Sequence, residues 1–280
     1  MKNSVIRSII NNTFLPNYGS IKTYFRKNNV VYNEENIIPG GFTLDFFPTN
    51  SKELFEQNLK TQPENWYYRT HEVKYTLNSL GYRTKEFDEI DWKESIVMFG
   101  CSFVFGIGVT DEHTIPYFLE ELSGRPVINM GIQGASIQTM LHNSIIFTDS
   151  KYPTPKAVIN AWPNAGRYQL YQNNSSFNFG DWNYLPDQKF SKKENLIPFN
   201  LMNIKMIRNL WKNKTIYHEA QFYFHIKTLI DRLDNKIISQ FYPATCSSGT
   251  SARDLQHIGP SQNFENAKRI YENLKPQLNS

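Results

Sequence analysis

The sequence has only two cysteines, Cys101 and Cys246, which are too few for a disulfide framework or a four-cysteine zinc site. It has no run near the ~18 apolar residues that a membrane-spanning helix needs. Residues 1–12 also lack the apolar stretch of a secretory signal. Positive charge is in small excess: 30 basic and 26 acidic side chains give a net charge of +4, and they are scattered. We therefore expect a soluble, cytoplasmic protein with no nucleic-acid partner and no membrane span.

The two parts of the chain, residues 1–94 and 95–280, differ in pattern. The first is irregular, with aromatic-rich pieces such as 41–48, and we expect an N-terminal extension of short strands and loops that packs on the core. In the second, short apolar runs alternate with helical patterns, which is typical of a parallel sheet covered by helices. Residues 165–218 interrupt the alternation and are predicted to be an aromatic-rich insertion.

This alternation predicts an α/β fold, a three-layer α/β/α sandwich with a mainly parallel, flavodoxin-like sheet. The predicted strands are 95–99, 126–130, 156–161 and 236–242, and the predicted helices are 114–124, 136–147, 219–234 and 261–275. Helical spacing in the last segment predicts that Phe264, Ala267, Tyr271 and Leu274 share one face.

The stretch VMFGCSFVFGIGV, residues 97–109, is an apolar run that breaks into glycines around Cys101 and Ser102. It lacks the lysine of a phosphate-binding P-loop, and its glycine spacing is not that of the dinucleotide fingerprint. Two interpretations remain. Ser102 is a nucleophile beyond the carboxyl end of a strand, where a following helical turn aims backbone N–H groups at an oxyanion, or the segment is an ordinary tight turn.

A serine nucleophile needs a base and an orienting acid. Asp254 and His257 stand three residues apart in RDLQHIGPS, residues 253–261, just after the last predicted strand and its loop. At this spacing in a turn, the carboxylate reaches the near nitrogen of the imidazole and fixes its tautomer. The other five histidines lack a comparable position after a predicted strand. We therefore interpret Ser102, His257 and Asp254 as a candidate catalytic triad.

Four blocks in order resemble the SGNH (GDSL-like) hydrolase superfamily, over roughly residues 75–275. They are GCSFVFGIGV (100–109), VINMGIQGAS (127–136), AVINAWPNA (157–165) and DLQH (254–257), and YTLNSLGYRTKEF (75–87) is similar to a lead-in segment of the family. The resemblance implies Ser102 as nucleophile, His257 as general base and then acid, and Asp254 as its orienter. It also implies an oxyanion hole formed by the backbone N–H groups of Ser102 and Gly134 and the Asn164 side chain.

Some of these assignments have alternatives. Gly131 competes with Gly134, although its position directly after a strand suits a turn, and Asn164 alternatively caps the turn after Pro163. The first block reads Gly-Cys-Ser where the family usually has Gly-Asp-Ser, so the bracing from that aspartate must come from elsewhere. We expect Cys101 to point toward the interior. The third block lacks the usual glycine and acid beside its asparagine.

A triad with an oxyanion hole performs acyl transfer. The resemblance implies ester substrates, including O-acetylated carbohydrates and lipids, and neither a metal nor a cofactor is required. An alcohol or amine acceptor in place of water makes the protein an acyltransferase, and the altered blocks also leave open a non-catalytic ligand-binding module. Trp162 and Arg167 are candidate substrate-binding residues, by ring stacking and anion binding; core packing and a surface ion pair are the alternatives. The sequence does not predict the oligomeric state.

Overall fold

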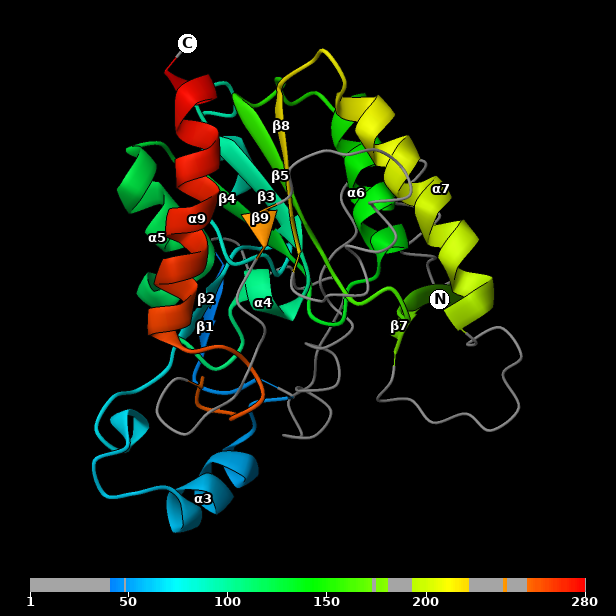
Figure 1. The fold of residues 1–280 in the computed structure, drawn as a ribbon. Coiled ribbons are helices and arrows are strands. Elements are labelled where there is room, and N and C mark those ends of the chain that lie inside the picture. The colour runs from blue at the N-terminus through cyan, green and yellow to red at the C-terminus, as the bar shows by residue number, and fades with distance from the viewer. Residues whose placement is uncertain are drawn as a thin grey trace.

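In the described part of the chain, five parallel strands form the central sheet, which lies between layers of helices (Figure 1). The structure, a computed structural model, describes residues 41–47, 49–172, 175–180, 193–221, 239–240 and 251–279. Within these residues the strand order is β4 (Val127–Gly131), β3 (Ile96–Gly100), β5 (Ala157–Trp162), β8 (Ile216–Gln221) and β9 (Ser239–Gln240), and every neighbouring pair is parallel. Numbered along the chain, this is the 2-1-3-4-5 order of flavodoxin-like sheets. The predicted fold class is confirmed.

Helices cover both faces of the sheet in the described structure and give three layers (Figure 1). α5 (Ile115–Ser123) packs with α9 (Pro260–Leu278) on one side, and α6 (Ile137–Asp149) packs with α7 (Lys193–Trp211) on the other. β3, β4 and β5 are buried along their whole lengths, as expected for strands that are covered on both faces. Their side chains form the main hydrophobic core together with the inner faces of the helices.

Local sequence signals set the ends of α5 and α6. The Thr114 side chain accepts the backbone N–H of Tyr117 at the start of α5, and α5 ends at Gly124 in the left-handed region, with φ 64°. At the start of α6, Ser136 and Thr139 form a capping box. Both helices begin and end within two residues of the predicted bounds.

The described part of the N-terminal extension has its own small sheet and core. β1 (Phe42–Leu44) pairs antiparallel with β2 (Tyr75–Leu77), and between them lie α3 (Lys52–Thr61), which the sequence did not predict, and the 3-10 turn η1 (Tyr67–Arg69); η2 (Phe87–Glu89) follows β2. Its apolar side chains form a second cluster that also includes Phe105 and Ile107. Because these two residues follow β3, the extension packs on the loop that carries Ser102.

Residues 165–221 differ in part from the prediction. Residues 219–221 lie in β8, so the expected helix over 219–234 is wrong at its start, and its remainder lies outside the described residues. Of the expected strand 236–242, β9 is the described part. The segment 165–218 does contain a hairpin, β6 (Tyr168–Gln172) with β7 (Ser175–Phe179), but it also contains α7 and the start of β8, which belong to the three layers. The division at residues 94 and 95 stays a prediction.

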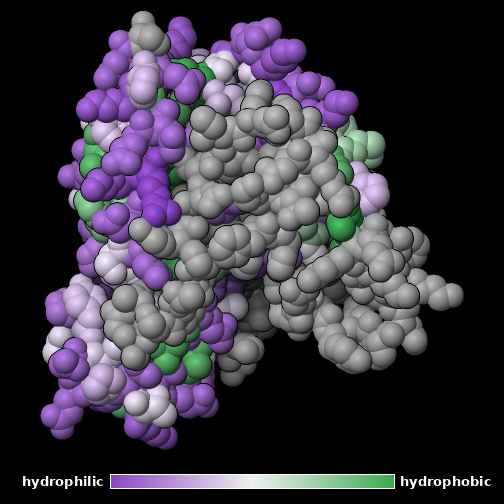
Figure 2. All heavy atoms as spheres, in the orientation of Figure 1, coloured by the Kyte–Doolittle hydropathy of each residue, from purple (hydrophilic) through white to green (hydrophobic). Residues whose placement is uncertain are grey.

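α9 begins one residue before the predicted bounds, ends three after them, and buries a somewhat different face. Ala267 and Leu274 are buried as predicted, but Phe264 is 39% exposed and Ile270 is fully buried in its place. The Phe264 ring instead contacts the ring of Phe118 on α5 at 5.5 Å, edge to face, at the rim of the layer. The outer surface over α9 is mainly hydrophilic (Figure 2). In the described parts of the chain, no helix has the length and apolar character to span a membrane.

Candidate active site

Ser102 is the first residue of α4 (Ser102–Phe105) and follows β3 directly, at the carboxyl edge of the sheet (Figure 1). The residue is 4% exposed. Cys101 before it is fully buried in the main hydrophobic core, which confirms that this side chain faces the interior. α4 ends at Gly106, which has φ 83°, and the Gly106 N–H donates to the Ser102 carbonyl over 2.9 Å. The sequence GCSFVFG thus forms one tight strand-to-helix turn.

Asp254 and His257 form the predicted pair. Their loop is closed by a bridge between Ser251 and Ile258. The Asp254 carboxylate is fully buried, and its Oδ2 lies 2.5 Å from His257 Nδ1. Its Oδ1 accepts the backbone N–H groups of Gln256 and His257, each over 3.1 Å. One carboxylate therefore shapes the loop and orients the imidazole, so that Nδ1 carries the proton and Nε2 is left as the basic nitrogen.

The imidazole lies close to the start of α4. The rings of His257 and Phe103, the residue after Ser102, have centroids 5.1 Å apart. Among the described residues, no hydrogen bond joins the Ser102 hydroxyl to the imidazole. Such hydroxyl–imidazole bonds are often long without substrate and tighten in the reacting complex. The structure thus brings the two loops into contact without closing this bond.

The two candidate oxyanion glycines have different structural roles. At Gly131, the last residue of β4, an added Cβ would lie 2.4 Å from the Phe105 backbone nitrogen, so this glycine lets α4 pack closely on β4. Gly134 lies in a turn closed by a 3.0 Å bond from Ala135 N–H to the Ile132 carbonyl, and it has φ 71°. Within the described residues its own N–H has no hydrogen-bond acceptor. Gly134 is therefore the glycine with a donor to offer.

The third sequence block places its residues differently. Asn164 follows β5 and its Oδ1 accepts the Gly166 N–H over 2.8 Å, so the side chain caps a turn, and this bond also orients the amide with Nδ2 as its donor. Trp162, at the end of β5, is fully buried in the main core, where its ring packs against protein. Arg167 is 8% exposed, and its backbone N–H donates to the backbone carbonyl of Asn164 over 3.1 Å. Substrate binding by Trp162 and Arg167 stays a prediction.

The candidates share one edge of the sheet. Ser102, Gly134 and Asn164 follow β3, β4 and β5, three adjacent parallel strands. In open α/β sheets, ligands bind beyond the carboxyl ends of the strands where the strand order reverses, and here that point lies between β3 and β5. In the described parts of the chain, no group of three or more His, Cys, Asp or Glu side chains is placed to hold a metal ion.

The other described histidines in regular elements have a different character. His218 on β8 is buried and His142 on α6 is half-buried, and desolvation lowers the pKa of each to about 4. Both are therefore neutral near pH 7, and they lie in the layers, on α6 and β8. His225 lies outside the described residues.

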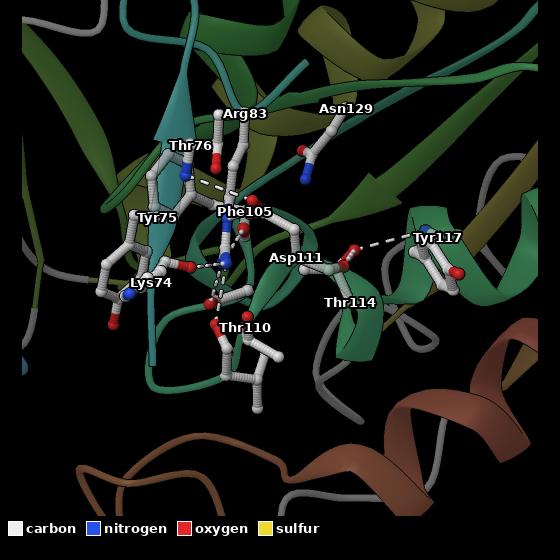
Figure 3. Close-up of polar contacts among 12 residues, drawn as sticks. Lys74, Tyr75, Thr76, Arg83, Phe105, Thr110, Asp111, Thr114, Tyr117 and Asn129 are labelled. Atoms are coloured by element: carbon white, nitrogen blue, oxygen red, sulfur yellow. Dashed lines mark hydrogen bonds and ion pairs between the residues drawn. The ribbon is translucent and has the colours of Figure 1, made fainter. Parts of the chain in front are cut away.

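Sequence reasoning missed Arg83, which braces the Ser102 loop (Figure 3). Its buried guanidinium bonds Asp111 Oδ1 through Nε over 2.5 Å. Nη1 donates to the carbonyls of Phe105 and Gly106, and Nη2 to those of Lys74 and Val109, over 2.5 to 3.2 Å. All the donor groups of the fork thus have partners. Arg83 thus binds three backbone carbonyls of the loop. It braces the loop in a chain that lacks the aspartate of the usual Gly-Asp-Ser block.

This bracing is expected to make Arg83→Lys lower the free energy of unfolding by about 3 kcal/mol, because lysine has one cationic centre and leaves buried carbonyls without donors. The measurement is urea unfolding followed by circular dichroism. Arg125→Lys is the matched control, since Arg125 makes a more exposed ion pair with Glu94 at 2.7 Å, and its change should stay within about 0.5 kcal/mol. Equal effects of the two substitutions would contradict the bracing role.

A comparison with protein-family models finds no match, and a comparison with curated proteins finds none either. Solved structures do match. A family two carbohydrate esterase from Clostridium thermocellum in complex with cellohexaose is 11% identical with a TM-score of 0.47, over 74% of this chain and 68% of that one. A carbohydrate esterase family 2 enzyme from Corynascus thermopiles is 12% identical with a TM-score of 0.45, over 67% of each chain.

A member of the lipolytic protein G-D-S-L family from Veillonella parvula is 14% identical with a TM-score of 0.42, over 64% of this chain and 96% of that one. These three solved structures are named as carbohydrate esterases and a GDSL-family protein, and this chain is similar to them in fold.

Proposed function

We propose that this protein is a serine hydrolase that cleaves an ester of a short acyl group, carried by a carbohydrate or a lipid alcohol. The observation that carries the proposal is the His257 imidazole, held at 2.5 Å by buried Asp254 and packed against Phe103, next to Ser102. A carboxylate that orients an imidazole beside a serine on a strand-to-helix turn is the arrangement that acyl transfer requires.

In the acylation step, His257 Nε2 takes the proton of the Ser102 hydroxyl as Oγ attacks the ester carbonyl carbon. The carbonyl oxygen becomes an oxyanion, which the N–H groups of Ser102 and Gly134 and the Asn164 amide stabilise by hydrogen bonds. The tetrahedral intermediate then collapses. The bond from carbon to the alcohol oxygen breaks, His257 returns its proton to that oxygen, and the acyl group stays on Ser102 as an ester.

In the second step, His257 Nε2 takes a proton from water and the resulting hydroxide attacks the acyl carbon. Collapse of the second tetrahedral intermediate breaks the bond to Ser102 Oγ, which receives the proton from His257. A carboxylic acid leaves and the enzyme is restored. Throughout both steps the Asp254 carboxylate accepts a hydrogen bond from the Nδ1–H of His257. It stabilises the imidazolium but does not become protonated.

A fluorophosphonate probe tests the proposal directly, because only an activated serine displaces its fluoride and forms a stable phosphonyl ester. We expect the folded full chain to gain one probe adduct, located on Ser102 by mass spectrometry of the peptide that contains it. Heat-denatured protein and the Ser102→Ala variant are the controls and should gain none. A folded protein that stays unlabelled, or one that is labelled at another residue, would refute the proposal.

A further inference from the structure

The N-terminal extension contributes no member of the proposed triad. Its side chains nevertheless contact both loops that carry the triad residues. The nucleophile loop is defined here as residues 101–110 and the acid–base loop as residues 251–259. Phe105 and Ile107 of the nucleophile loop are buried in the second hydrophobic cluster, which the extension forms, and Leu255 of the acid–base loop packs at its edge. The second hydrophobic cluster therefore borders both loops.

The two loops also touch each other directly, at Gly108. The Arg253 backbone N–H donates to the Gly108 carbonyl over 2.9 Å. Gly108 has φ 77°, and an added Cβ would lie 2.7 Å from the Ala252 Cβ, so the chains approach as closely as glycine allows. Arg253 immediately precedes Asp254, and any movement at this contact therefore changes the position of the carboxylate that orients His257.

A ring of hydrogen bonds from the extension closes around this contact. The fully buried Tyr75 hydroxyl accepts the Gly108 N–H over 2.8 Å and an Asn50 side-chain N–H over 2.6 Å. The Asn50 Oδ1 in turn accepts from Arg253 Nε over 3.2 Å. With the bond from Arg253 to Gly108, the ring runs from Tyr75 to Asn50, Arg253, Gly108 and back. Tyr75 is the member that reaches the nucleophile loop through a side chain.

Two buried guanidinium groups, those of Arg83 and Arg253, hold members of this ring of hydrogen bonds in place. Arg83 stacks on the Tyr75 ring at 4.6 Å (Figure 3). Arg253 lies 4.5 Å from the centre of the Phe46 ring, and its carbonyl accepts an N–H of the Asn58 side chain over 3.0 Å. Burial raises the pKa of Tyr75, so its hydroxyl stays neutral and keeps its place in the ring at ordinary pH.

We propose that Tyr75 is a positioning residue for the acyl-transfer reaction: its hydroxyl, through Gly108 and Asn50, holds the nucleophile loop and the acid–base loop in register so that Ser102 and His257 meet. The inference rests on the proposed function. It assigns a role in catalysis to a described residue of the extension, Tyr75, which acts through the two loops.

The test replaces Tyr75 by phenylalanine, which keeps the ring and its packing and removes the hydroxyl. We expect kcat for p-nitrophenyl acetate to fall about 10- to 100-fold, because a small displacement of reacting groups is enough for such a loss, while KM stays within about twofold. Tyr68→Phe is the matched control. Tyr68 is 3% exposed in the same cluster, and in the described structure its hydroxyl has no hydrogen-bond partner, so its removal should leave kcat unchanged.

Amide hydrogen exchange supplies a readout that does not depend on activity. In Tyr75→Phe, exchange should become about tenfold faster in both the nucleophile loop and the acid–base loop, and in Tyr68→Phe in neither. Asn50→Ala should lower kcat similarly, and the double variant with Tyr75→Phe should be no worse than the stronger single one, because both break one ring.

The outcomes separate this inference from the proposed function. An active wild-type protein with unchanged kcat in Tyr75→Phe overturns the inference alone. Faster exchange confined to one loop also overturns it, since the loops would then not be coupled. A wild-type protein with no turnover that depends on Ser102 overturns the proposed function, and with it the catalytic role of Tyr75.

Discussion

Replacing Ser102 by alanine is expected to lower kcat for p-nitrophenyl acetate by about 10⁴-fold or more, to the level that oxyanion stabilisation and binding alone sustain. The reason is chemical, because without Oγ no acyl-enzyme forms. The fold should be unaffected. The Ser102 hydroxyl makes no hydrogen bond among the described residues, so its removal should change the free energy of unfolding by less than about 0.5 kcal/mol.

Cys101→Ala is the control for this experiment, because Cys101 is the neighbouring nucleophilic side chain. It is fully buried in the main core, so its replacement should lower stability by about 1 kcal/mol through loss of packing and leave kcat nearly unchanged. The two variants therefore separate chemistry from packing. Turnover that survives in Ser102→Ala, or is lost in Cys101→Ala without unfolding, would show that the nucleophile has been misassigned.

The first part of the α/β layers could be predicted from the sequence because its signals are local. β3, β4 and β5 are short apolar runs that are buried on both faces, and they read as strands without knowledge of their partners. The ends of the intervening helices are likewise set by neighbouring residues, with Thr114 as the N-cap and Gly124 as the stop of α5. In each case the strand or the helix end is determined by residues that lie close to it in the sequence.

β8 could not be predicted in this way because its sequence, IYHEAQ, is too polar for a central strand. The charge of the buried Glu219 is neutralised by Arg208 on α7, which donates to both carboxylate oxygens over 2.5 and 2.7 Å. Tyr217, in β8 itself, donates to one of these oxygens over 3.0 Å. A charge that is neutralised by a partner on another element can be buried, but no periodicity within the strand reveals that partner.

The candidate site shows the same division. Asp254 and His257 are three residues apart, and their bond could be predicted from that spacing. The residues that hold their loop could not, since Asn50 precedes Arg253 by 203 residues and Asn58 by 195. Arg83 and Tyr75 were visible only as part of a lead-in segment. The glycines do give a partial signal, because Gly108 and Gly131 mark places where another chain segment approaches too closely for a Cβ.

Asp254→Asn is expected to lower kcat for p-nitrophenyl acetate by about 10³- to 10⁴-fold while leaving the fold intact. Asparagine keeps an oxygen that can accept the Gln256 and His257 backbone N–H groups, so the loop retains its shape. Its other group is an amide N–H₂, which donates to Nδ1 and so places the imidazole proton on Nε2, where the base is needed. The fall in kcat therefore comes from the wrong imidazole tautomer and not from a change of structure. The midpoint temperature of thermal unfolding should change by only a few degrees.

Asp254→Ala distinguishes the two roles of this carboxylate. It removes the partner of Nδ1 and also leaves two backbone N–H groups of the loop without an acceptor, so we expect a similar loss of kcat together with a loss of about 2 kcal/mol or more in stability. Paired measurements of kcat, the rate of fluorophosphonate labelling and the midpoint of thermal unfolding decide the matter. Activity of Asp254→Asn within tenfold of wild type would mean that His257 does not depend on Asp254 for its tautomer, and that the 2.5 Å contact is structural only.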